Sequence, residues 1–76
     1  YLGLGMIMQR KGEFKESAGI LEEGLSHWPD SEDLNLCLGI SSMNLGDFKT
    51  ALDRFSKFPE SGAARKYIDE CRRALK

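Results

Sequence analysis

The sequence predicts an all-α fold in which antiparallel helix pairs stack on one another. Three observations support this prediction: one segment recurs at a fixed offset, apolar residues follow helical spacing, and glycine or proline separates the helical patterns. The recurrence carries the most weight. Residues 4–14, LGMIMQRKGEF, return as residues 38–48, LGISSMNLGDF, at an offset of 34 residues. A fixed period of this length is typical of stacked helical repeats.

The two copies have six identical positions among their first 24 residues. The identical pairs are Leu2 and Leu36, Leu4 and Leu38, Gly5 and Gly39, Gly12 and Gly46, Phe14 and Phe48, and Lys15 and Lys49. We therefore expect a single domain, 1–76, made of a first repeat at 1–30, a truncated second repeat at 31–60 and a capping helix at 61–76. Because Tyr1 leads directly into the repeat without an initiator Met, we expect the chain to be part of a longer protein.

Sequence signals mark the ends of the first three predicted helices. The first helix ends at Gly12, because glycine tolerates the left-handed conformation that closes a helix. The second begins near Phe14 and ends before Pro29, since the residue before a proline is disfavoured in the α region. Ser31 is a favourable N-cap for the third helix. The five helices are expected at 1–11, 14–27, 31–44, 48–57 and 61–75.

Gly46 separates the third helix from the fourth, and Ser61 provides the N-cap of the fifth. The connecting loops are short, so neighbouring helices should run antiparallel. The fifth helix is expected to cover the exposed side of the second repeat with its apolar residues Tyr67, Ile68 and Cys71.

Small residues predict where helices cross. Gly5 and Gly39 should face the second helix of their pairs, because a Cβ atom would hold the helices apart. The small residues opposite them are Ser17, Ala18 and Ala51, and the space around these is expected to be filled by Phe14, Phe48 and Phe55. The apolar stripe on the same side of the first helices is expected to pack against the second helices. This stripe comprises Leu4, Met8, Leu38 and Leu45.

Composition excludes several classes of protein. The chain is 41% apolar and 30% charged, with a formal net charge of −1, which is typical of a folded globular protein and gives no bulk attraction to nucleic acid. No apolar run is long enough to span a membrane. We expect Cys37 and Cys71 to be buried free thiols, and the single His27 cannot complete a metal site with them. We therefore expect no enzyme activity, no cofactor and no metal. The sequence does not specify the cellular compartment, and the cytoplasm is the default expectation.

The pattern of large and small residues resembles the tetratricopeptide repeat. In the first copy the matching residues are Leu4, Gly5, Met8, Ser17, Leu21, Gly24 and Pro29, and in the second they are Leu38, Gly39, Ser42, Ala51, Phe55, Phe58 and Pro59. The resemblance covers residues 1 to about 58. It departs where Tyr1 and Asn35 replace the usual tryptophan, where Ser42 replaces a large aromatic, and where Phe58 replaces a small residue. It implies a right-handed α-solenoid of two repeats with a C-terminal capping helix.

The resemblance also implies a function as a protein–protein interaction scaffold. In this family the first helix of each pair lines a concave groove, here expected to bind an apolar helix or an extended segment of another protein or peptide. The matching residues are Leu2, Met6, Gln9, Leu36, Ile40, Met43 and Asn44. A carboxylate clamp is not favoured, since only Arg10 and Asn44 are suitably polar. Two alternatives stay open: a structural or homo-oligomerisation module, and the regulatory arm of a larger enzyme.

The fifth helix carries several basic residues. They are Arg65, Lys66, Arg72, Arg73 and Lys76. Asp69 and Glu70 interrupt them, so we expect a solvated outer face with charge pairs rather than a binding patch for an anionic partner.

Overall fold

A computed structural model describes residues 1–75 of the chain, and it is all-helical over that range. The five helices are α1 (Leu2–Arg10), α2 (Phe14–His27), α3 (Glu32–Asn44), α4 (Phe48–Ser56) and α5 (Gly62–Ala74). Every predicted helix is present, and each boundary lies within one residue of its expected position. None of the described residues forms a β-strand.

Local signals explain why the helices begin and end where they do. The Ser31 Oγ accepts a hydrogen bond from the Leu34 N–H at 3.3 Å, and the Ser61 Oγ accepts one from the Ala64 N–H at 3.3 Å. Gly12 and Gly46 adopt φ angles of 78° and 82°, a region that other residues enter only with strain. The predicted caps and breaks are confirmed.

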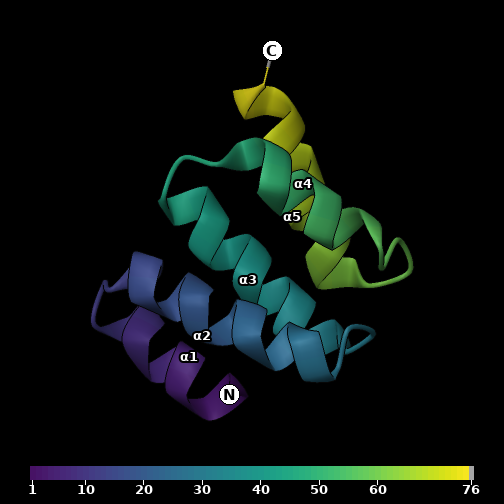
Figure 1. The fold of residues 1–76 in the computed structure, drawn as a ribbon. Coiled ribbons are helices and arrows are strands. Elements are labelled where there is room, and N and C mark those ends of the chain that lie inside the picture. Colours follow the sequence, from purple (N-terminus) through teal and green to yellow (C-terminus); the bar gives the residue numbers. More distant parts are fainter. Residues whose placement is uncertain (76) are drawn as a thin grey trace.

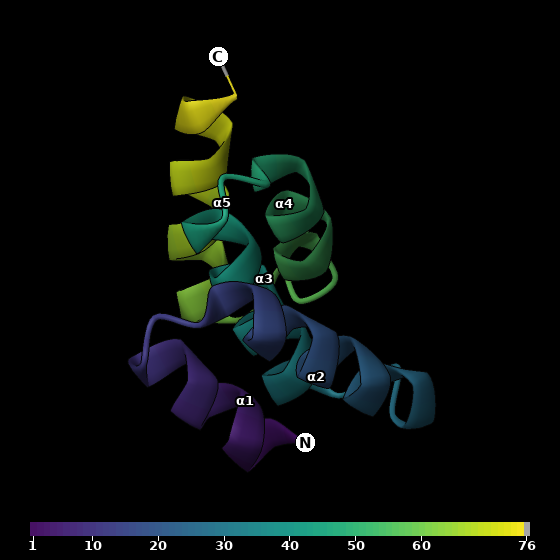
Figure 2. The same cartoon turned by 60° about the vertical axis from the view of Figure 1, so that its left-hand side comes forward.

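Each helix packs on the next along the chain, and α1 also contacts α3. Figures 1 and 2 show α3 in the middle of the molecule, with α1 and α2 on one side of it and α4 and α5 on the other. The first and last described helices therefore lie at opposite ends (Figure 1). The molecule measures 31 × 24 × 17 Å, with a radius of gyration of 11.3 Å. This radius is typical of a compact chain of this length.

Two apolar clusters form the core, one on each side of α3. The first joins α2 to α3 and contains Leu21, Leu25, Leu34 and Leu38. The second joins α4 to α5 and contains Ala51, Phe55, Ala64, Ile68 and Cys71. Removing these side chains from water is the main driving force for packing the helices.

The fifth helix covers the second cluster, as expected. Ile68 and Cys71 are buried in that cluster, and the ring of Tyr67 stacks on Phe55 with the ring centroids 5.1 Å apart. Cys71 is a buried free thiol, as predicted, whereas the free thiol of Cys37 is only half-buried.

Both predicted glycine crossings are present. A Cβ atom on Gly5 would lie 2.6 Å from the Leu21 Cδ2 atom, and one on Gly39 would lie 2.6 Å from the Phe55 Cζ atom. Any side chain at these positions would force the helices apart. Around Gly39 the phenyl ring of Phe55 fills the gap that the glycine leaves, as expected, and it lies closer to the glycine than Ala51 does.

Two of the residues expected to pack between the two helices of a pair are exposed instead. Leu4 is 49% exposed and Leu45 is 50% exposed. Leu38 is buried, but it packs against Leu21 and Leu25 of α2 and not against α4, the second helix of its own pair, as was expected. Leu45 lies beyond the end of α3 as its C-cap, so it cannot follow the helical stripe. On α1 the residue at the α1–α2 crossing is Gly5, and Leu4 lies about 100° around the helix from it.

Candidate functional site

The predicted groove residues on α1 differ in how accessible they are. Leu2 is half-buried against the first cluster, and Gln9 is half-buried against α3. Met6 is 41% exposed. Of these three side chains, Met6 is therefore the one most available to a partner.

The predicted groove residues on α3 mostly contribute to packing. Leu36, Ile40 and Met43 are half-buried and pack against the second cluster. Asn44 is exposed at the end of the helix, where its Nδ2 donates a hydrogen bond to the Ile40 carbonyl at 2.9 Å. Met6 and Asn44 are thus the exposed members of the predicted groove, and the other members are half-buried.

Gln9 links the predicted groove residues of α1 to helix α3. Its Nε2 donates hydrogen bonds to the Cys37 carbonyl and to the Ser41 Oγ, each at 2.7 Å. These bonds join α1 directly to α3. Cys37 and Ser41 are not among the predicted groove residues of α3, so these bonds show contact between the helices but not between the two predicted stripes.

Gln9 also begins a relay of hydrogen bonds that the sequence analysis missed. The Ser41 Oγ donates to the Ser17 Oγ at 3.0 Å, and the Ser17 Oγ donates to the Gly5 carbonyl at 2.8 Å. The relay starts and ends on α1 and passes through α3 and α2. Ser17 and Ser41 are both fully buried. The sequence places both serines within apolar helix patterns, which is the only sign that their hydroxyls are buried. It cannot show that the two hydroxyls meet.

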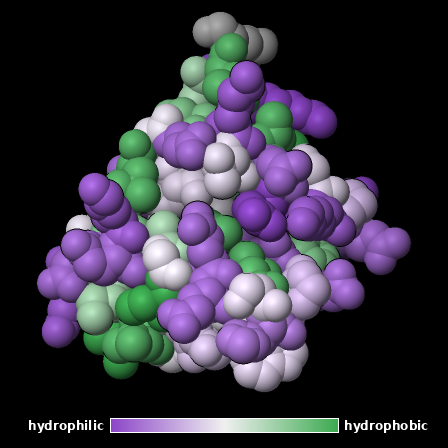
Figure 3. Space-filling model, in the orientation of Figure 1, coloured by the Kyte–Doolittle hydropathy of each residue, from purple (hydrophilic) through white to green (hydrophobic). Residues whose placement is uncertain are grey.

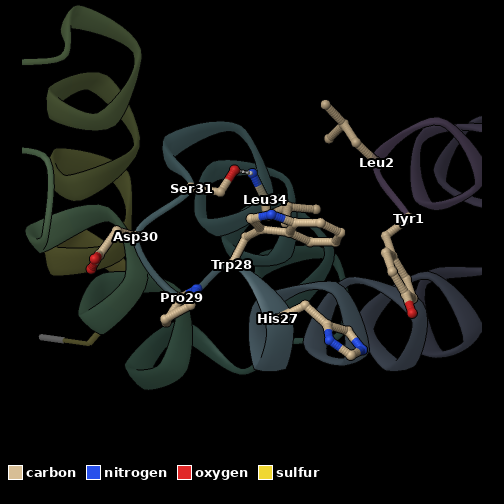
Figure 4. A pocket seen from close by; sticks show the side chains of 8 residues that line it. All are labelled: Tyr1, Leu2, His27, Trp28, Pro29, Asp30, Ser31 and Leu34. Atoms are coloured by element: carbon tan, nitrogen blue, oxygen red, sulfur yellow. Dashed lines mark hydrogen bonds between the residues drawn. The ribbon is translucent and has the colours of Figure 1, made fainter.

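A second feature that the sequence analysis missed is an open pocket at the α2–α3 turn, shown in Figure 4. Its volume is about 630 Å³. The lining residues are Tyr1, Leu2, His27, Trp28, Pro29, Asp30, Ser31 and Leu34. In Figure 4 the indole of Trp28 lies over Leu34, between Ser31 and Tyr1, while Asp30 points away.

The aromatic rings beside this pocket pack on one another. The ring centroid of His27 lies 5.7 Å from that of Tyr1 and 5.6 Å from that of Trp28. These distances correspond to direct ring contact, which leaves no room for a ligand between the rings. Trp28 is 58% exposed, so the outer surface of this aromatic group is available for contact.

Reactive groups are few in the described part of the chain. Burial raises the pKa of the Cys37 thiol, and the Asp33 carboxylate raises it further. Burial likewise raises the pKa of Cys71, with a further contribution from Glu70. A raised pKa lowers the thiolate fraction and makes both thiols poor nucleophiles. Within residues 1–75, no cluster of three His, Cys, Asp or Glu side chains is placed to hold a metal ion.

The outer face of α5 is charged with both signs. Arg65, Lys66, Asp69 and Glu70 are all exposed. The Arg65 Nε donates to the Pro59 carbonyl at 2.8 Å, so this guanidinium also helps to hold the turn before α5. Lys76, which was counted among the basic residues, lies outside the described residues.

Over residues 1–75, no helix combines the length and the apolar character needed to cross a membrane. The chain matches no protein-family model, no curated protein and no solved structure.

Proposed function

We propose that the chain is a protein-binding module, with its helices arranged as a tetratricopeptide-like right-handed solenoid. The observation that carries this proposal is the exposure of large apolar side chains on two faces of α1: Met6 on the face of the proposed groove, and Leu4 and Ile7 on a different face. Leu4 and Ile7 are each 49% exposed, and Met6 is 41% exposed. Scattered single apolar residues are normal on a surface, but several on one short helix are typical of an interaction site.

The proposed groove lies along α1 and α3, with Met6 and Asn44 at its surface. Its half-buried floor is formed by Leu2, Gln9, Leu36, Ile40 and Met43. An apolar helix or an extended segment of a partner would displace water from this floor, and the flexible Met6 side chain would adapt to the shape of the ligand. Asn44 would supply a polar contact at the edge.

Peptides selected from a random display library can test this groove. We expect the selected peptides to bind the 76-residue chain, and we expect Met6→Lys to weaken their binding at least tenfold, as measured by calorimetry. Lysine would place a charge among apolar contacts. Leu45→Lys is the matched control, because Leu45 is equally accessible but lies beyond the end of α3.

Ile40→Lys is a poorer probe of the groove, because Ile40 packs against the second cluster and its replacement would disturb the fold. If the selected peptides bind the Met6→Lys variant as tightly as the original chain, the groove assignment is wrong. Sedimentation velocity of the free chain tests the alternative function, homo-oligomerisation. A stable dimer that Met6→Lys dissociates would replace the scaffold proposal.

A further inference from the structure

The outer face of α1 is an apolar surface distinct from the groove, and it consists of Gly3, Leu4 and Ile7. All three residues are exposed. No atom lies within 4 Å of the position that a Cβ on Gly3 would occupy. Figure 3 shows hydrophobic surface gathered at the lower left, over the position that α1 has in Figure 1.

The internal repeat indicates what would cover this face. At the offset of 34 residues, Leu4 corresponds to Leu38 and Ile7 corresponds to Ser41 on α3. There the equivalent face is covered, since Leu38 is 1% exposed and Ser41 is 0% exposed. Most of the cover comes from α2, which packs Leu21 and Leu25 against Leu38, and Gln9 of α1 adds hydrogen bonds to the Ser41 Oγ and the Cys37 carbonyl. The same backbone face is thus occupied by a helix in one copy and unoccupied in the other.

We propose that the outer face of α1 is a docking site for an amphipathic helix of the α2 type, supplied by a partner protein. The docked helix would bury Leu4 and Ile7 as α2 buries Leu38 and Ser41. This site rests on the proposed function as a protein-binding module, but it lies on a different face of α1 from Met6.

Side-chain differences between the outer face of α1 and the equivalent face of α3 define the chemistry of the docked helix. On α3 the Ser41 hydroxyl bonds to Ser17 of α2 at 3.0 Å. Ile7 has no hydroxyl and is larger than Ser41, so the docked helix should carry alanine or glycine where α2 has Ser17. Leucines one and two turns later, as at Leu21 and Leu25 of α2, would then pack around Leu4.

Charge indicates the orientation of the docked helix and argues against α1 of a second copy as its occupant. Because Ser17 in the first turns of α2 meets Ser41 near the end of α3, the start of the docked helix should lie near the end of α1. Arg10 and Lys11 are exposed there. An acidic first turn would complement them, whereas residues 1–12 contain no acidic residue. Pairing α1 with α1 of a second copy would therefore bring together only positive charges.

A labelled peptide of residues 13–28 with Ser17→Ala is a suitable probe, because it has the acidic start, the alanine and the two leucines. We expect its fluorescence anisotropy to rise saturably with the 76-residue chain. Ile7→Glu in the chain should weaken binding at least tenfold. Met6→Lys in the groove and Leu45→Glu should leave binding unchanged, and Leu21→Glu in the peptide should abolish it. Circular dichroism should show unchanged helix content in each variant.

Three results would overturn this proposal. They are no saturable binding of the peptide to the original chain, equal binding to the Ile7→Glu variant, and a dimer of the original chain that Ile7→Glu dissociates while the peptide does not bind. The third result would assign the face to a second copy of the chain. Each result is independent of the groove, because the groove is tested by Met6→Lys and the library peptides.

Discussion

At the scale of single residues, the helix crossings depend on two glycines that have no room for a side chain. Gly39→Ala should destabilise the fold by about 1–3 kcal/mol, because the added Cβ would lie 2.6 Å from a phenyl ring that is fully buried. Gly19→Ala is the control, since no atom lies within 4 Å of its Cβ position. It should stabilise α2 by about 0.5–1 kcal/mol through helix propensity. Urea unfolding measures both effects, and a stabilised Gly39→Ala variant would contradict the crossing.

Another residue-scale prediction concerns the N-caps of α2 and α4. Asp47 accepts a hydrogen bond from the Thr50 N–H at 3.2 Å, whereas Glu13, at the equivalent position and with a similar backbone conformation, makes no such bond. Glu13→Asp should therefore stabilise the fold by about 0.5–1 kcal/mol, because the shorter side chain can reach the free N–H groups. Thermal unfolding at pH 7 measures the gain, with Glu16→Asp as a control inside the helix.

The same cap gives a pH dependence with a defined sign. Hydrogen bonds from the side chain and the backbone of Thr50 lower the pKa of Asp47. A lowered pKa in the folded state means that the carboxylate stabilises the fold above its unfolded pKa, and that this contribution is lost as the pH falls through the folded value. We expect the benefit of Glu13→Asp to disappear in the same acidic range. A benefit that persists at pH 2 would show that it does not arise from a carboxylate cap.

At the scale of helices, the hydrogen-bond relay should couple α1, α2 and α3. Ser41→Ala should cost about 1–3 kcal/mol, because it leaves a buried Ser17 hydroxyl and the Gln9 amide without a shared partner. The double variant with Ser17→Ala should cost less than the sum of the two single variants, since both remove the same contact. A double-mutant cycle by urea unfolding tests this. Strict additivity would contradict the relay.

The second prediction at this scale concerns α5. Deleting residues 61–76 should expose Ala51 and Phe55, which are fully buried in the structure. Terminal elements of stacked helical folds are needed to shield such apolar surface. We expect the shortened chain to lose cooperative thermal unfolding and to aggregate. A sharp transition at the original temperature would show that α5 is dispensable.

The helices themselves could be predicted from the sequence because their signals are local. Gly12, Ser31, Pro29 and Ser61 act on the backbone within a few residues, so their effects do not depend on distant neighbours. The groove could not be predicted to the same degree. The spacing of Ile40 and Met43 predicts one apolar stripe. Their half-burial depends on how α4 and α5 approach α3, and no local pattern specifies that approach.

For the whole molecule, the central position of α3 predicts a gradient of local stability. It contacts α1, α2 and α4, and its residues pack into both apolar clusters. We expect the slowest native-state hydrogen exchange at the amides of α3 and the fastest within α1, which has one unoccupied face. Exchange measured by NMR tests this gradient. Uniform protection across the five helices would show that the chain opens only by global unfolding.

The hydrogen-bond relay also disfavours domain swapping between copies of this chain. Gln9 and Ser17 correspond, at the 34-residue offset, to Met43 and Ala51. Met43 packs against the second cluster, and Ala51 belongs to it. In a domain-swapped dimer, the α3–α4 segment of one molecule would replace α1 and α2 on another. Ser41 would then face methyl and thioether groups with no hydrogen-bond partner, which is unfavourable for a buried hydroxyl. The chemical difference between two otherwise similar halves thus favours the intramolecular arrangement over exchange between molecules.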